Sequence, residues 1–223
     1  MRRYPAYDPP EYVTWRPEPD VLAAYRRTIE AQPERWRIVE TAPVRLLLDL
    51  YAGLVRNRLH DVTLKRWVKQ GIIPKAWLGT GEEACTIGPV HALERRGRDG
   101  DVVCPMIRNA GACHEMGMPV ADMLRGYLGT PDSPTRGRDL HVGDLRYGVV
   151  APISMMGSNV PVMTGYALAF KMRGEPRVAL TWIGDGATKT LECHEGLNFA
   201  AVQRVPAIFV IQNNQVALGT LLH

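Results

Sequence analysis

The sequence predicts an α/β protein built around a mostly parallel sheet, and three observations support this fold class. Two apolar runs of strand length, 177–183 and 206–211, are rich in aliphatic residues, as buried parallel strands are. The stretch between them, 190–204, has helical length. Its apolar residues at helical spacing are Leu191, Leu197, Ala201 and Val202. The unit is therefore strand, helix, strand, and a right-handed crossover brings the carboxyl ends of both strands to one edge.

The segments before this unit predict an arm followed by one domain. Residues 1–40 are rich in proline, tyrosine and charge, with one predicted helix at 20–32, and we interpret them as an N-terminal docking arm. Residues 41–223 form the predicted α/β domain, which starts with a helix over 45–71 that ends at a glycine.

Two further helices and a loop are predicted inside the domain. The first helix covers 120–128, and the second covers 160–173, with a proline near its first position and Gly174 just past its end. Between them, 129–146 is loaded with Gly, Pro and Asp, which is typical of a functional loop.

Polar residues follow both strands of the unit, at the edge where open α/β sheets bind ligands. Gly184-Asp185-Gly186 ends the first strand and Asn213-Asn214 ends the second. Asp185 offers a carboxylate oxygen, Asn214 an amide oxygen, and the backbone carbonyl of Val216 a third, which are ligands suited to Mg²⁺ together with substrate phosphates. The glycines let backbone approach a phosphate, and the next helix directs N–H groups towards it. The pair predicts a metal and diphosphate site.

Five further motifs accompany this pair in the same order in which one enzyme family carries them. They are Gly81-Glu-Glu-Ala84, Arg108 within 105–109, Gly137-Arg-Asp-Leu-His141, Gly157-Ser-Asn-Val-Pro161 and His194-Glu-Gly-Leu-Asn-Phe-Ala200. On these residues the chain, from roughly 46 to 220, resembles the alpha subunit of the thiamine-diphosphate-dependent decarboxylating component of 2-oxo acid dehydrogenase complexes. The resemblance implies a three-layer α/β/α thiamine-diphosphate-binding fold, here incomplete at its C-terminal side.

The resemblance also implies roles for individual residues. Asp185, Asn214 and the Val216 carbonyl are expected to hold Mg²⁺, and His141 is expected to donate a proton or contact substrate. The residues expected to bind the cofactor are Arg108, Ser154, Met156, Gly184, Asp185, Gly186, Ala187, Asn214 and Val216. Of these, Arg108 and the amides of Gly186 and Ala187 would bind the diphosphate, whereas the backbone of Ser154 and Met156 would meet the aminopyrimidine.

The reaction implied by the resemblance is oxidative decarboxylation of a 2-oxo acid, pyruvate or a branched-chain one, with acyl transfer to lipoamide. The family's activating glutamate comes from a beta subunit, so the expected partners are that subunit, in an α2β2 heterotetramer, and a lipoyl acyltransferase core. The family continues well beyond the position of His223, and we therefore expect a truncated subunit. Two alternatives stay open: an acetoin dehydrogenase alpha subunit, and a truncated assembly partner without catalytic activity.

Composition argues against several other classes of function. The chain has 46% hydrophobic and 22% charged residues, as soluble enzymes have, and we expect a cytoplasmic protein that does not bind membranes. The net charge of +4 comes from scattered arginines, and we expect no nucleic-acid binding. A dinucleotide-binding domain would need a third glycine where Lys189 stands.

Overall fold

The computed structural model describes residues 18–217 and 220–221. The chain divides into two compact units, 1–52 and 53–223. The helices are α1 Pro19–Glu30, α2 Pro33–Thr41, α3 Val44–Lys69, α4 Glu83–His91, α5 Ala110–Glu115, α6 Val120–Leu128, α7 Asn159–Arg173 and α8 Leu191–Gln203, and the strands are β1 Val102–Cys104, β2 Ala179–Gly184, β3 Ala207–Gln212, β4 Val216–Ala217 and β5 Thr220–Leu221.

The first unit contains one helix that the sequence predicts and one that it does not. The predicted helix over 20–32 is α1, while α2 was missed. Neither helix buries a residue, so burial does not distinguish the helix that was predicted from the one that was missed. Proline at the first helical position, Pro33, is the local signal that marks its start. Residues 1–17 of the predicted arm lie outside the described residues.

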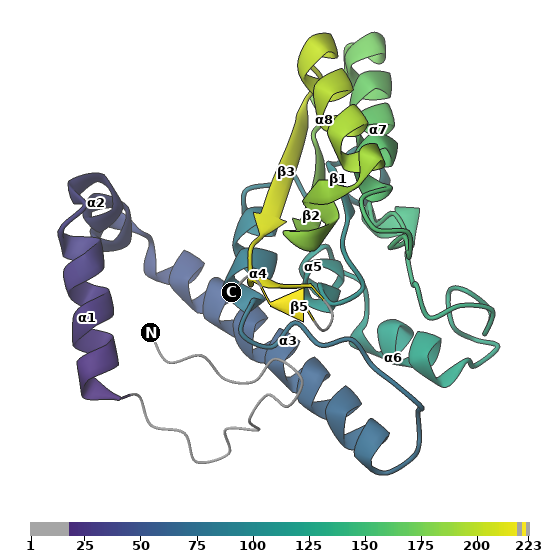
Figure 1. Cartoon of the computed structure of the whole chain (residues 1–223), viewed down its shortest axis with the longest axis horizontal. Helices are drawn as coiled ribbons and strands as arrows, with labels where there is room; N and C mark the ends of the chain where they lie inside the picture. The colour runs from purple at the N-terminus through teal and green to yellow at the C-terminus, as the bar shows by residue number, and fades with distance from the viewer. Residues whose placement is uncertain (1–17, 218–219, 222–223) are drawn as a thin grey trace. The chain divides into compact units, whose positions relative to one another are not determined.

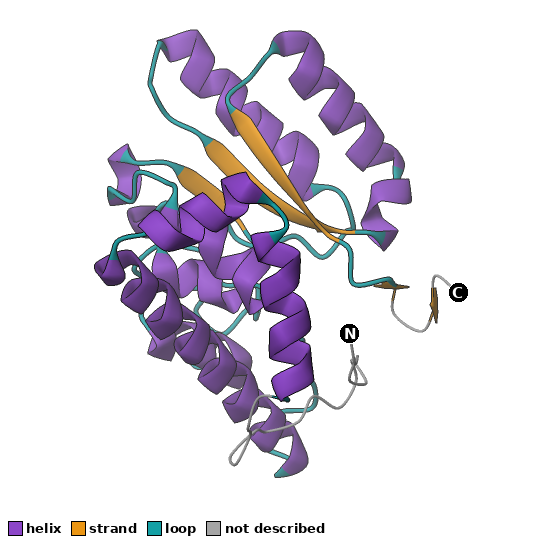
Figure 2. Cartoon of the chain, turned by 90° about the vertical axis from the view of Figure 1, so that its left-hand side faces the viewer, coloured by secondary structure: helices purple, strands orange, loops and turns teal. Residues whose placement is uncertain are grey.

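The second unit is built on a parallel sheet, as predicted. In the described residues the sheet has the order β1-β2-β3, with both strand pairs parallel. The registers place Val103 opposite Leu180 and Leu180 opposite Ile208. Helices α7 and α8 lie side by side on one face of this sheet (Figure 1). Figure 2 shows the strands, in orange, with that helix pair on one face, and residues of α4 and α5 pack on the other face.

The alternation of side chains along β2 explains the three layers. Leu180 and Trp182 point to one face and pack with residues of α4 and α5, where the Trp182 Nε1–H donates to the Cys85 carbonyl at 2.8 Å. Ala179 and Ile183 point to the other face and pack with residues of α7 and α8. A strand that is buried on both faces loses the alternating pattern of a half-exposed strand, which is why β2 is apolar along its length.

Strand β3 is less covered than β2. Ile208 and Ile211 are 45% and 54% exposed, whereas Leu180 and Ile183 of β2 are at most 1% exposed. Within the described residues β3 lies at the end of the strand order and pairs only with β2. The sheet is therefore incomplete on this side.

The helix α8 forms where predicted, but only one of its four predicted apolar residues packs on the core. Leu197 is half-buried against the cluster that contains Ile183 and Cys193, whereas Leu191, Ala201 and Val202 are exposed. The fully buried residues are Cys193, Gly196 and Ala200. Small residues are needed there because a Cβ on Gly196 would lie 2.7 Å from Val160 of α7. Close helix contact, rather than the large apolar residues, selects the buried side.

A layer of polar side chains lies buried between α3 and α5. The Gly111 N–H donates to Asn57 Oδ1 at 3.0 Å, and a hydrogen bond of 3.2 Å joins His60 Nδ1 to His114 Nε2. Desolvation by burial lowers the pKa of His60 to about 3 and that of His114 to about 4. Both imidazoles are therefore neutral in the folded protein over the pH range in which they would gain protons when unfolded.

This histidine pair predicts a pH-dependent stability. The folded pKa values of both histidines lie below the usual value of 6.5. The stability that the neutral pair contributes is therefore fully present above pH 6.5 and is lost as pH falls towards 4. Asp61 works in the opposite direction, since burial raises its pKa from 3.8 to about 7, so its folded form takes up a proton over the same range. On acidification the unfolded chain gains two histidine protons, whereas the folded protein gains one proton on Asp61, so the free energy of unfolding falls.

In the His114→Gln variant one proton fewer is taken up on unfolding. We therefore expect its free energy of unfolding to change with pH less steeply than the parent's, by about 1.4 kcal/mol per pH unit between pH 5 and 6.5. Urea unfolding at several pH values measures the slope. His194→Gln, at an exposed position on α8, is the matched control and should keep the parent slope. A His114→Gln slope equal to the parent's contradicts the account.

Candidate functional site

The predicted site residues line one cavity of about 580 Å³ at the carboxyl edge of the sheet. Every residue to which the sequence assigned a role is in its wall: Arg108, His141, Ser154, Met156, Gly184, Asp185, Gly186, Ala187, Asn214 and Val216. They come from the ends of β1, β2 and β3 and from the two loops 129–158 and 213–217. The structure brings the residues together, and their individual roles stay predictions.

Asp185 stands directly after β2, where the strand turns into a short 3-10 helix, Gly186–Lys189. The Asp185 carbonyl accepts hydrogen bonds from the backbone N–H and the hydroxyl of Thr188, at 3.2 and 2.6 Å. Among the described residues no hydrogen bond or ion pair engages its carboxylate. The half-buried Asp185 carboxylate is thus available to a cation in the cavity.

Gly186 lets the two strand-end loops close on each other. A Cβ on Gly186 would lie 2.7 Å from the Cβ of Ala217, closer than two carbon atoms can approach. The sequence prediction assigned the glycines to close approach of a phosphate, and at Gly186 the neighbour in the structure is the loop after β3. This contact holds Asp185 and Val216 in the wall of the same cavity.

Asn214 is fixed in orientation by two hydrogen bonds. Its Oδ1 accepts from the Val216 N–H at 2.9 Å, and its Nδ2 donates to Glu82 Oε1 at 2.6 Å. An amide oxygen has two lone pairs, so Oδ1 keeps one for a further ligand.

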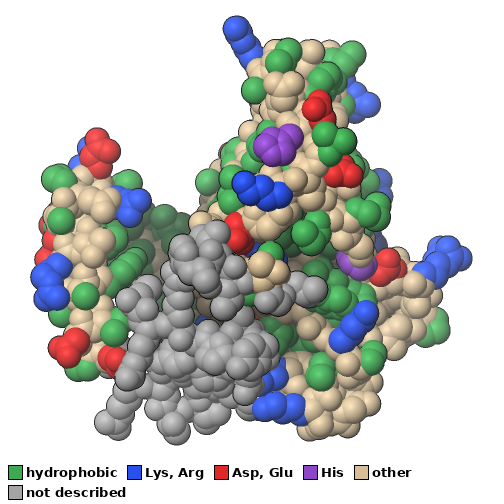
Figure 3. All heavy atoms as spheres, viewed as in Figure 1, with side chains coloured by type: hydrophobic (Ala, Val, Ile, Leu, Met, Phe, Trp, Pro, Cys, Tyr) green, Lys and Arg blue, Asp and Glu red, His purple; other side chains and the backbone are tan. Residues whose placement is uncertain are grey.

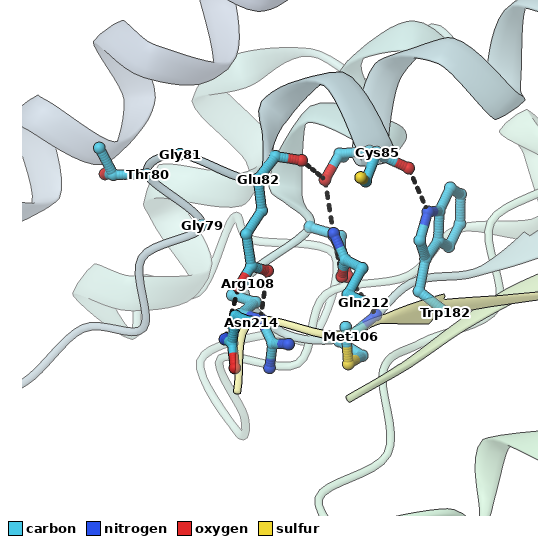
Figure 4. Close-up of polar contacts among 12 residues, drawn as sticks. Gly79, Thr80, Gly81, Glu82, Cys85, Met106, Arg108, Trp182, Gln212 and Asn214 are labelled. Carbon is cyan, nitrogen blue, oxygen red and sulfur yellow. Dashed lines mark hydrogen bonds and ion pairs between the residues drawn. The ribbon is translucent and has the colours of Figure 1, made fainter. Parts of the chain in front are cut away.

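Arg108 also forms a hydrogen bond with the Glu82 carboxylate. Its Nε donates to Glu82 Oε2 at 2.7 Å (Figure 4). The other end of the guanidinium lies over Gly184, because a Cβ built there would be 3.4 Å from Nη2 and 3.8 Å from Nη1. With Nε engaged, four of its five N–H groups stay available to phosphate oxygens.

The residues present fit a divalent cation with a diphosphate. One free carboxylate and one amide oxygen with a lone pair to spare are hard oxygen donors, as Mg²⁺ requires, and the guanidinium supplies the positive charge that a diphosphate requires. Apolar side chains such as Met106, Trp182 and Ile183 complete the wall. The arrangement can hold a charged group at one end and a flat organic group along its apolar side.

His141 belongs to a chain of three polar side chains. Asp139 Oδ1 lies 2.6 Å from His141 Nδ1, and Ser154 Oγ lies 2.9 Å from His141 Nε2. The hydrogen bond from His141 lowers the pKa of Asp139. Since a carboxylate only accepts hydrogen bonds, it selects the tautomer with the proton on Nδ1. Nε2 is then a proton acceptor at the cavity wall.

Sequence reasoning missed the functional contacts of two residues. Glu82 lies in the motif Gly81-Glu-Glu-Ala84 but was given no role, and Asp139 lies in the motif that ends at His141. Their positions inside recognised motifs are the only sequence signal. Two-residue spacing in a loop does not fix which way a side chain points, so the contacts with Arg108 and His141 needed the structure.

The loop before α4 packs closely against Arg108. A Cβ on Gly79 would lie 2.3 Å from the Arg108 backbone oxygen, so we expect the Gly79→Ala variant to move Arg108 and to lose about 1–3 kcal/mol of stability. The exposed Gly88 inside α4 has no atom within 4 Å of such a Cβ. The matched Gly88→Ala variant should change the free energy of unfolding by less than about 1 kcal/mol, because the gain in helix propensity is opposed by crowding between the new Cβ and Pro89. Chemical unfolding measures both, and equal effects would contradict the contact.

Charged side chains of both signs are spread over the described part of the face that Figure 3 shows. On the face shown in Figure 3, the coloured Lys and Arg side chains are interspersed with acidic and apolar ones. Among the described residues, no helix combines the length and apolarity that crossing a bilayer requires.

Comparison with known proteins identifies a family and several relatives. The family model described as dehydrogenase E1 component matches residues 53–222. The alpha subunit of acetoin:2,6-dichlorophenolindophenol oxidoreductase from Cupriavidus necator is 36% identical over 78% of this chain and 52% of its own length. The 2-oxoisovalerate dehydrogenase alpha subunit of Bacillus subtilis is 32% identical over 77% and 52%. The pyruvate dehydrogenase E1 alpha subunit of Porphyra purpurea is 28% identical over 79% and 53%.

The matched stretch contains the whole cavity wall. The chain spans about half the length of these relatives.

Proposed function

We propose that this chain, which belongs to the dehydrogenase E1 component family, forms the alpha-subunit part of an enzyme that decarboxylates a 2-oxo acid oxidatively with thiamine diphosphate and Mg²⁺. One observation carries the proposal. Asp185, Asn214 and Arg108, which lie far apart in the sequence, converge on one cavity whose remaining wall is mostly apolar. That cavity suits an ion, a diphosphate and an aromatic ring system in one ligand.

The charged end of the cofactor is assigned to the edge of the sheet. Mg²⁺ would take the Asp185 carboxylate, the Asn214 amide oxygen and the Val216 carbonyl. The diphosphate would take Arg108 and the amides of Gly186 and Ala187, which open the 3-10 helix after β2. Bound thiamine diphosphate supplies the reactive carbon and the electron sink for decarboxylation.

The chain's own acid–base group in this proposal is His141. Asp139 holds the proton on Nδ1, so Nε2 can accept a proton from a group in the cavity and return it. Ser154 occupies Nε2 at 2.9 Å in the structure, and its hydroxyl would yield to substrate or pass the proton on. The exposed Ser154 and Met156 are assigned to contacts between their backbone and the aminopyrimidine.

We also propose two protein partners for this chain, on the basis of its family. A beta subunit would complete the cleft in an α2β2 assembly, and a lipoyl acyltransferase core would accept the acyl group. The similarity to the acetoin oxidoreductase subunit favours acetoin as an alternative substrate. A chain that only assembles with the beta subunit, without turnover, is the second alternative.

Removal of the free carboxylate tests the metal assignment. We expect the Asp185→Ala variant to bind thiamine diphosphate with Mg²⁺ at least about tenfold more weakly, about 1.4 kcal/mol, because it removes the charged cation ligand. Calorimetry at fixed Mg²⁺ gives the dissociation constants. Asp99→Ala, at an exposed position outside the cavity, should match the parent. Equal affinity of the parent and Asp185→Ala rules out the site as assigned.

Turnover tests the need for the partner. We expect the purified chain alone to release no labelled carbon dioxide from pyruvate or a branched-chain 2-oxo acid, since an activating carboxylate is assigned to the beta subunit and proton-transfer groups contribute about 10²–10⁴-fold each. Adding a beta subunit should restore release, and comparison with acetoin cleavage then separates the substrates. Release by the chain alone refutes the half-site assignment, whereas no turnover with any partner supports the assembly alternative.

A further inference from the structure

The Glu82 carboxylate stands between two residues of the proposed cofactor site without being assigned to the cofactor itself. It accepts Arg108 Nε at 2.7 Å through Oε2 and Asn214 Nδ2 at 2.6 Å through Oε1. Figure 4 shows Glu82 reaching from the start of α4 to both side chains, one from the segment after β1 and one from the segment after β3. No other described side chain joins these two residues directly.

Glu82 is itself held firmly. Its side chain is only 17% exposed, and its backbone carbonyl accepts the first hydrogen bond of α4 from the Thr86 N–H at 3.2 Å. The preceding Gly81 has φ +95 and donates its N–H to Glu83 at 2.8 Å. Glycine is favoured at this positive φ, so the turn delivers the Glu82 side chain in one direction.

We propose that Glu82 is a positioning residue that sets the orientation of the Arg108 guanidinium and the Asn214 amide, so that one presents N–H groups to a diphosphate and the other presents oxygen to a cation. The inference rests on the proposed function. It goes beyond it because Glu82 acts through two other side chains and does not itself line the cavity.

The chemistry of a carboxylate is what makes the orientation unique. It accepts hydrogen bonds and donates none when ionised, so the Asn214 amide must turn its NH₂ group towards Glu82 and its oxygen away. The Arg108 Nε–H donates to the same carboxylate, so the Nη1 and Nη2 end of the guanidinium points away from Glu82 and lies over Gly184. A glutamine of the same shape has one oxygen in place of two, so it cannot accept from both partners, and one of Arg108 and Asn214 loses its acceptor.

The sign of a charge effect separates this role from a bystander role. A negative charge beside a diphosphate repels it, so removal of the charge alone should tighten binding. Loss of orientation should weaken it instead, because an Arg108 or Asn214 side chain without its carboxylate acceptor no longer holds its direction towards the ligand. The two explanations therefore give opposite results for one substitution.

The experiment compares Glu82→Gln with Glu94→Gln in the full chain. Glu94 is the matched control, because its exposed carboxylate pairs with Arg96 at 2.8 Å and does not line the cavity. Calorimetry at fixed, saturating Mg²⁺ measures the dissociation constant of thiamine diphosphate, which should rise about tenfold or more in Glu82→Gln, as expected for losing one hydrogen bond to a charged group. Glu94→Gln should stay within about threefold of the parent. Unchanged or tighter binding in Glu82→Gln overturns the proposal.

A cofactor-free measurement keeps the inference distinct from the proposed function. In the parent, NMR signals of the Arg108 Nε–H and the Asn214 NH₂ should be shifted downfield and protected from exchange with water, and Arg108→Lys and Asn214→Ser identify them. In Glu82→Gln at least one should lose its shift, while Glu94→Gln keeps both. Fast exchange of both in the parent overturns the proposal even if Glu82→Gln does not fold. A parent with protected signals that does not bind thiamine diphosphate overturns the proposed function alone.

Discussion

Parallel pairing of β1, β2 and β3 is the constraint on which the site depends. Because all three strands run the same way, their carboxyl ends share one edge, and the residues that follow them are delivered to one place. Arg108, Asp185 and Asn214 each lie within four residues of a strand end. The helices α7 and α8 are the crossovers that make this arrangement possible, and their close contact at Gly196 holds the sheet from one face.

Converging strands place the residues near one another, but orientation needs further contacts. Gly186 meets Ala217, so the loops after β2 and β3 close with no space for a side chain. Glu82 links the residue after β1 to the residue after β3. A second link lies behind it, where Asn109 Nδ2 donates both to Thr86 and to Gln212 of β3, at 2.6 and 3.0 Å. The cavity is thus fixed by contacts that no single element contains.

The difference between what sequence reveals and what it hides follows from this division. The strands β2 and β3, the helix between them and the convergence of Asp185 on Asn214 are set by local periodicity and by chain handedness, which a sequence displays. The buried face of α8 was predicted only in part. Leu197 packs on the core, but small residues that allow close approach take the place predicted for Leu191 and Val202. The roles of Glu82 and Asp139 depend on side-chain direction at turns, which has no periodic signal.

The anchoring of Glu82 extends below the cavity into the buried polar layer of α3. The Asp61 carboxylate accepts the Gly79 N–H at 2.9 Å and the Thr80 hydroxyl at 3.2 Å, so it holds the loop that packs on Arg108. Burial, together with the nearby Glu83 charge, raises the pKa of Asp61 to about 7. An ionised Asp61 is a better acceptor, but burial disfavours it, so the loop is held by a group that is costly to ionise at neutral pH. Burial of Asp61 thus lowers the free energy of unfolding at neutral pH, while its hydrogen bonds hold the loop before α4, from which Glu82 reaches Arg108 and Asn214.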